Sequence, residues 1–272
     1  MSSSDKPLKS VKKGAGKIRQ RVGTHIYILP NLLTTANMFF GFFAIIYSIR
    51  GEYLWASYAI VFAAVFDLLD GRVARMTRTT SDFGAEYDSL CDLVSFGMAP
   101  GILLYLWALQ PFGRIGWLAS FVYVACGALR LARFNVAHDT EEKGYFQGLP
   151  IPMAAGIVAS SVLAFTDLEL EAGRNYILLG MTLLLAVVMV SNFRYRSFKD
   201  IDFRRKMPFF YLVVGLSIIA IVAIRPEVML FVLFLSYAVL GAIFGILRLG
   251  RPLKSKARAT ADGYNDFNDE DL

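Results

Sequence analysis

The chain has 272 residues, of which 56% are hydrophobic and 18% charged, and its formal net charge at pH 7 is +6. A soluble domain has about 45–50% apolar residues, and the excess here lies in long apolar runs that predict an integral membrane protein. Two cysteines and two histidines argue against a disulfide framework and against an imidazole metal site.

In chain order, three regions are expected. Residues 1–25 form a polar, basic tail that is either a disordered anchor or an interfacial amphipathic helix. Residues 26–250 hold apolar runs of roughly the 20 residues that a membrane helix needs. Residues 251–272 end in clustered acids and are expected to be disordered. The expected fold class is all-α, a polytopic bundle with spans at 27–49, 53–76, 88–109, 116–137, 151–166, 175–193, 208–224 and 227–247.

The basic residues alternate along the chain. All but four of the 28 lie in the N-terminal tail, at the end of an even-numbered span or after it; the exceptions are Arg50, Arg114, Arg174 and Arg225. Cytoplasmic loops carry the excess of lysine and arginine, so this pattern predicts that both termini are cytoplasmic. The net charge is then explained by topology and by attraction to anionic headgroups, and nucleic-acid binding is not expected.

Acidic residues gather between spans 2 and 3, in FDLLDGRVARMTRTTSDFGAEYDSLCD (residues 66–92). Asp67 and Asp70 share one helix face, and Asp88 and Asp92 share another. Because the connection is short, we expect these four carboxylates to meet near the cytoplasmic interface. Their repulsion must be relieved by protonation or by a cation, and an all-oxygen site suits Mg²⁺ or Mn²⁺.

Neighbouring residues indicate a site for a diphosphate. Gly71 and Gly84 permit close approach to the backbone, and Arg75 can bind a phosphate. Two alternatives remain open: the acids pair with Arg72, Arg75 and Arg78 at the interface, or they hold the ion of a cation-coupled transporter.

The spacing Asp67-x2-Asp70-Gly71-x2-Ala74-Arg75-x8-Gly84-x3-Asp88-x3-Asp92 resembles the signature of the CDP-alcohol phosphatidyltransferases. Members of this family are helical membrane proteins, usually dimeric, that transfer a phosphatidyl group from a CDP-linked lipid to an alcohol and release CMP. The resemblance implies a homodimer and two divalent ions held by Asp67, Asp70, Asp88 and Asp92, with Asp92 also the general base. Asp82 and Glu86, outside the signature, are expected at a helix start and on a solvated face. The resemblance also implies a CDP-lipid site made of Asn31, Thr34, Asn37, Gly71, Ala74, Arg75, Ser81 and Gly84.

Three further stretches, PNLLTTANMFFGFFA, CGALRLARFN and GLPIPMAAG, resemble the bacterial branch of the family whose acceptor is L-serine, in which CDP-diacylglycerol is the donor. Serine carries a carboxylate, which Arg130 and Arg133 on one helix face could bind, with polar contacts from Asn135 and Gln147. The alternatives are that both arginines anchor the helix at the interface, or that they hold the phosphate of glycerol 3-phosphate or of an inositol phosphate.

Overall fold

The computed structural model describes residues 9–77, 81–137, 145–191, 194–196, 215–217 and 224–249. Within these ranges, the side chains of residues 9–28, 137, 145–147, 194–196, 242 and 244–249 are outside the description. Predictions made for the first eight residues, for 251–272 and for most of the span 208–224 therefore fall outside the described residues.

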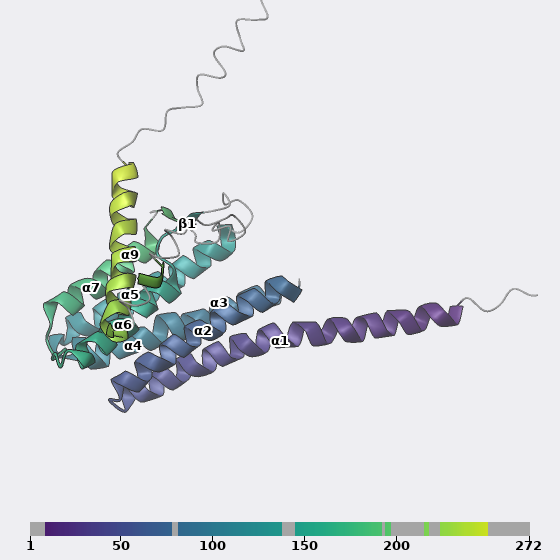
Figure 1. The fold of residues 1–272 in the computed structure, drawn as a ribbon, viewed down its shortest axis with the longest axis horizontal. Helices are drawn as coiled ribbons and strands as arrows, with labels where there is room; N and C mark the ends of the chain where they lie inside the picture. Colours follow the sequence, from purple (N-terminus) through teal and green to yellow (C-terminus); the bar gives the residue numbers. More distant parts are fainter. Residues whose placement is uncertain are drawn as a thin grey trace, which may run out of the picture.

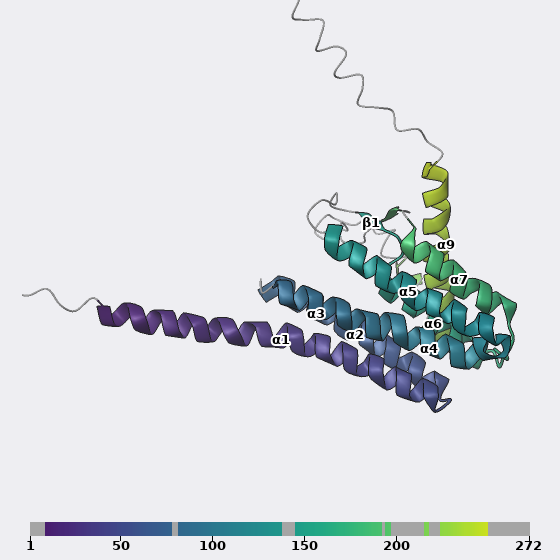
Figure 2. The same ribbon diagram turned by 180° about the vertical axis from the view of Figure 1, so that it is seen from behind.

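The described residues form a helical bundle in which the chain runs back and forth (Figure 1). α1 (Lys9–Ile49) and α2 (Tyr53–Thr77) pack along each other, and the first part of α1 projects beyond the bundle in both views (Figures 1 and 2). The third passage of the chain is composite. It consists of α3 (Asp82–Asp92), the π-helical η1 (Leu93–Met98), α4 (Ala99–Leu104), the π-helical η2 (Tyr105–Leu109) and the 3-10 turn η3 (Gln110–Phe112).

The remaining elements complete the bundle. They are α5 (Arg114–Ala137), α6 (Ile151–Asp167), α7 (Tyr176–Val190) and α9 (Pro226–Leu249). Two short strands, β1 (Tyr145–Gln147) and β2 (Arg194–Arg196), pair antiparallel with Phe146 opposite Tyr195. This small pair was not predicted from the sequence.

Helix length and composition agree with a membrane protein. Four helical segments are long and apolar enough to cross a bilayer: Leu29–Ile49, Tyr53–Thr77, Asp82–Phe112 and Arg114–Val136. Three shorter apolar helices cover Ile151–Asp167, Tyr176–Val190 and Pro226–Gly241. The predicted all-α, polytopic class is therefore confirmed, and seven of the eight predicted spans correspond to described helices.

Small side chains form much of the helix contact surface. On α2, Ala56, Ala59 and Ala63 are buried and follow a helical spacing. α6 is buried along most of its length and packs against α2 and α9, which makes it the centre of the core. Small residues let the backbones of membrane helices approach closely, so dispersion contacts can hold them together in lipid.

α1 and η1 are in close backbone contact. A Cβ atom added to Gly41 would lie 2.6 Å from the Cα atom of Ser95. Ser95 in turn donates its hydroxyl to the backbone carbonyl of Asn37, at 3.0 Å. The absence of a side chain at position 41 therefore allows α1 to lie directly on the segment that follows Asp92.

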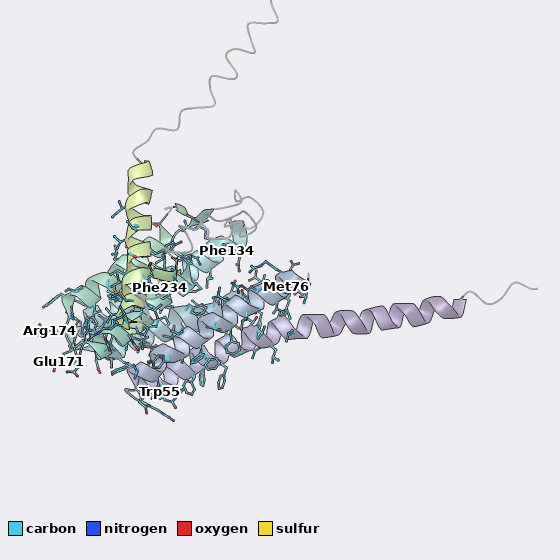
Figure 3. All side chains as sticks on the ribbon, in the orientation of Figure 1. Trp55, Met76, Phe134, Glu171, Arg174 and Phe234 are labelled. Carbon is cyan, nitrogen blue, oxygen red and sulfur yellow. The ribbon has the colours of Figure 1, made fainter. Side chains whose placement is uncertain are left out.

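The two ends of the bundle are separated by the length of the helices. Met76 of α2 and Phe134 of α5 lie toward one end, and Trp55, Glu171 and Arg174 lie toward the other (Figure 3). The start of α3 is joined to the end of α5 at the first end, and an ion pair joins Arg225 to Asp167 at the second. This arrangement agrees with alternating passages of the chain across a bilayer.

Substituting Gly41 by alanine should destabilise the protein, because the new methyl group would overlap the η1 backbone. Overpacking of this kind costs about 1–3 kcal/mol. Thermal unfolding in detergent should show a lower midpoint than wild type. Gly180 of α7 is the matched control, since a Cβ there would meet nothing within 4 Å. Gly180→Ala should leave the midpoint unchanged or raise it, and an equal loss in both variants would refute the close contact.

Candidate active site

Three of the four predicted carboxylates come together. Asp67 and Asp70 of α2 and Asp88 of α3 each place one carboxylate oxygen within 4.8 Å of the others. The spacing of three residues puts the first two on one helix face. α1 packs against both α2 and α3, which holds the two acidic segments at the same end of the bundle.

Two carboxylate oxygens of this cluster lack hydrogen-bond partners. Oδ2 of Asp70 and Oδ1 of Asp88 are buried and accept no hydrogen bond from the described residues. The described Arg72 and Arg75 are exposed, and neither lies within 4.0 Å of these carboxylates as an ion pair. Buried negative charge without a partner is costly, and three such groups repel one another. An oxygen-only set of acids with unfilled acceptor positions fits a divalent cation such as Mg²⁺ or Mn²⁺.

A cavity of about 260 Å³ opens beside the acids. Asp70 and Asp88 contribute to its wall, and three elements supply the rest: the start of the apolar part of α1, the end of α2 and the start of α3. Seven of the eight residues predicted for the CDP-lipid line this cavity: Asn31, Thr34, Gly71, Ala74, Arg75, Ser81 and Gly84. Pro30 and Ala85 also line it and were not predicted.

Local sequence features shape this cavity. Ser81 is the N-cap of α3, and its hydroxyl accepts a hydrogen bond from the backbone N–H of Gly84 at 3.0 Å. A Cβ at Gly84 would approach that hydroxyl to 3.1 Å, and one at Gly71 would meet only the end of Arg75 at 3.8 Å. Side chains at these positions would take space from the cavity. Asp82 lies in the first turn of α3, as expected for a helix start.

Asp92 is not one of the three acids whose oxygens lie within 4.8 Å of one another. Its side chain is 8% exposed, and its Oδ1 accepts a hydrogen bond from Nδ2 of Asn37 at 3.1 Å. It is the last residue before the π-helical turn η1, and π-helical turns are frequent at functional sites. Asn37 contacts Asp92 and is not among the residues that line the cavity. Neither the π-helical turn nor this contact was predicted from the sequence.

The arginines proposed for the acceptor occupy different surroundings. Arg130 of α5 is buried, with 8% of its surface exposed. Arg133 donates from Nη2 to the backbone carbonyls of Val190 and Ser191, at 2.7 and 3.4 Å, and so joins α5 to the end of α7. Cationic groups at a helix C-terminus satisfy its free carbonyls. Gln147 lies in β1, and its side chain is outside the described residues.

Asn135 joins α5 to α3. Its amide nitrogen lies 3.1 Å from the Ser89 hydroxyl and 3.3 Å from Oε2 of Glu86. Glu86 is exposed, as expected for a solvated face, but it also accepts this bond. The spacing of Glu86 and Ser89 would have indicated a shared helix face, whereas the partner on α5 depends on packing between helices.

Comparison with known proteins gives the same family as the motif. The family model described as CDP-alcohol phosphatidyltransferase matches residues 27–193. The chain is 38% identical over 225 residues to a CDP-diacylglycerol–serine O-phosphatidyltransferase of Helicobacter pylori strain J99, covering 82% of this chain and 94% of the relative. The chain belongs to the CDP-alcohol phosphatidyltransferase family, and the predicted family membership is confirmed.

Two further relatives come from other organisms. One, from Mycobacterium tuberculosis strain H37Rv, has the same name and is 31% identical over 236 residues, covering 82% of this chain and 79% of the relative. An archaetidylserine synthase of Methanothermobacter thermautotrophicus strain Delta H is 40% identical over 174 residues, covering 63% and 71%. The names of all three relatives refer to serine or to a serine lipid.

Substituting Asp88 by asparagine should weaken the stabilisation of the protein by metal. In chelator the variant should unfold at or above the wild-type temperature, because one buried like charge is gone. With Mg²⁺ or Mn²⁺ at about 100 times its dissociation constant, wild type should gain about 2.7 kcal/mol and the variant much less. Thermal unfolding of purified protein with and without metal measures both effects. Asp82→Asn, on the same helix but outside the cluster, should keep the wild-type response to metal; an unchanged response in Asp88→Asn would contradict the metal site.

Proposed function

We propose that this chain transfers the phosphatidyl group of CDP-diacylglycerol to the hydroxyl of L-serine, giving phosphatidylserine and CMP. The observation that carries the proposal is a single cavity in which the clustered acids adjoin the glycine, alanine and arginine positions of the family signature. The family gives the reaction class. The relatives' names support serine as the acceptor.

The cavity is proposed to hold the CDP head of the lipid. Arg75 supplies a guanidinium group for the diphosphate, and Gly71, Ala74 and Gly84 leave room for it. Asn31, Thr34 and Ser81 supply polar groups around the nucleotide. The helices carrying these residues are membrane helices, so the acyl chains can stay in lipid while the head reaches the cavity.

Asp67, Asp70 and Asp88 would hold the divalent metal, with Asp92 beside a second ion. When bound, Mg²⁺ or Mn²⁺ neutralises the diphosphate and stabilises the negative charge on the departing phosphate. The unpartnered oxygens of Asp70 and Asp88 fit this role.

Asp92 is proposed as the general base. The hydroxyl of serine attacks the phosphorus that bears diacylglycerol, and its proton moves to the Asp92 carboxylate. The new oxygen–phosphorus bond forms as the bond from that phosphorus to the bridging oxygen breaks, and CMP leaves with the bridging oxygen. We favour this direct displacement because none of the described residues that line the cavity carries a thiol, an amine or an imidazole.

The acceptor is proposed to bind beside α5. Arg130 would pair with the serine carboxylate, Asn135 and Gln147 would add polar contacts, and Arg133 would contribute a second guanidinium group on the same helix face. Glycerol 3-phosphate or an inositol phosphate remains the second candidate acceptor, because an arginine also binds phosphate. The family match and the lining of the cavity favour a transferase over a cation-coupled transporter.

The cellular setting follows from the charge pattern. We propose an inner or plasma membrane location, with both termini and the active site on the cytoplasmic side. The proposed catalytic domain is residues 26–250, flanked by the tails 1–25 and 251–272. We further propose that the protein acts as a homodimer.

Purified protein should release CMP from CDP-diacylglycerol when L-serine and Mg²⁺ or Mn²⁺ are present. The product should be phosphatidylserine, identified by mass spectrometry. Glycerol 3-phosphate, an inositol phosphate and inositol are the comparison acceptors. Turnover with one of these but not with serine would contradict the proposed acceptor, and dependence on no acceptor at all would contradict the transferase.

Replacing Arg130 with alanine should raise KM for serine far more than KM for CDP-diacylglycerol. Losing a charge-assisted hydrogen bond costs about 1.5–3 kcal/mol, which corresponds to roughly 10- to 150-fold. Steady-state kinetics with each substrate varied in turn separates the two constants. Arg114→Ala, at the other end of the same helix, is the control. Equal increases in both KM values for Arg130→Ala would indicate a structural arginine.

A further inference from the structure

The side chain of Asn37 is completely buried, and its contact is with an acid rather than with the cavity. Its exposed fraction is 0%, and its Nδ2 lies 3.1 Å from Oδ1 of Asp92. The described residues supply no second hydrogen bond to the Asp92 carboxylate. Asn37 is therefore the group that sets the orientation of this side chain.

Charge fixes which way the amide faces. A carboxylate only accepts hydrogen bonds, so the NH₂ group of Asn37 must point toward Asp92 and its oxygen away. That oxygen, Oδ1, is buried without a partner among the described residues. A buried, unsatisfied acceptor costs about 1–3 kcal/mol. The asparagine is thus a poor choice for stability alone at this position.

The backbone fixes where the amide lies. The carbonyl of Asn37 accepts a hydrogen bond from the hydroxyl of Ser95 at 3.0 Å. One turn later, Gly41 brings α1 against the backbone of η1. Both contacts are made with Ser95, three residues after Asp92, and they fix α1 against η1 beside the carboxylate.

The hydrogen-bond donor to Asp92 is a neutral amide. Asp70 and Asp88 each have a buried oxygen that accepts no hydrogen bond from the described residues, whereas Oδ1 of Asp92 accepts one from an amide. An amide is neutral, so it orients the carboxylate without supplying the opposite charge that would make it a weaker base. An arginine in this place would orient the carboxylate and would also supply a positive charge that makes it a weaker base.

We propose that Asn37 is a positioning residue for the general base: it holds Oδ1 of Asp92 so that Oδ2 can take the proton of the acceptor hydroxyl. This inference rests on the proposed function through the role of Asp92. It differs from the sequence-based expectation that Asn37 contacts the CDP-lipid, and the kinetic constants distinguish the two roles. A positioning residue should affect the chemical step and leave the binding of both substrates unchanged.

The test is a double-mutant cycle between positions 37 and 92. Asn37→Leu keeps the branched shape of the side chain, with larger end groups, and removes the donor; Asn37→Ala removes both the shape and the donor. Each should lower kcat by about 10²-fold, the effect of misplacing a catalytic group by about 1 Å, while both KM values stay near wild type. Adding Asn37→Leu to Asp92→Asn should cause little further loss, because groups that act as a unit are not additive.

Two further measurements make the result specific. Thermal unfolding should show that Asn37→Leu is folded at the assay temperature, because removal of the unpartnered Asn37 oxygen offsets part of the cost of leaving Oδ1 of Asp92 without its donor. Ser48→Ala is the matched control on α1: Ser48 is equally buried, and its hydroxyl donates to the carbonyl of Ala44, away from Asp92. This variant should keep wild-type kcat.

Two results would overturn the proposal. One is a raised KM for CDP-diacylglycerol with unchanged kcat, which would assign Asn37 to lipid binding. The other is a full additional loss in the double variant, which would mean that Asn37 acts independently of Asp92. Failure of the proposed function would be detected separately, because the wild-type protein would then form no phosphatidylserine from CDP-diacylglycerol and L-serine. If another alcohol is the acceptor, the same cycle is measured with that alcohol.

Discussion

Repulsion among buried carboxylates is the constraint on which the site depends. Asp67, Asp70 and Asp88 place oxygens within 4.8 Å of one another, with no arginine pairing to them among the described residues. In a bundle of membrane helices, water is too scarce to screen such charges, so the arrangement is stable only when a cation or protons neutralise it. Without a bound cation, the cluster lowers the stability of the fold, which is the expected cost of a cation-binding site. Asp70 and Asp88 also line the adjoining cavity, so a cation bound to them would lie next to the proposed diphosphate site.

α1 organises the rest of the site around this cluster. It contacts α2, α3 and η1. Its residues Asn31 and Thr34 line the cavity, and its Asn37 donates a hydrogen bond to Asp92. The close approach at Gly41 is what lets one helix serve both the cavity and the fourth acid. Substrate binding and orientation of the proposed base therefore depend on the same helix contact.

Much of this geometry could be predicted from helical periodicity and from one motif. The spacing of Asp67 and Asp70 puts them on one face, and the family signature identified most of the residues that line the cavity. Other features depend on how helices pack. The bond from Asn37 to Asp92 and the capping of α7 by Arg133 join residues far apart in the sequence. The π-helical turn after Asp92 is local, but helical periodicity does not distinguish it from an α-helical turn. The third span was predicted to begin at residue 88, whereas the helix begins at Asp82 because Ser81 caps it six residues after the last signature residue of α2.

The central claim is that the three clustered acids hold a divalent metal at the wall of the substrate cavity. Anomalous diffraction from crystals of the wild-type protein soaked in Mn²⁺ tests it most directly, because it locates the ion independently of activity. The account predicts an anomalous peak within about 2.5 Å of oxygens of Asp67, Asp70 and Asp88, the distance expected for metal–oxygen ligands. No peak at these acids in crystals that bind Mn²⁺ elsewhere would contradict it.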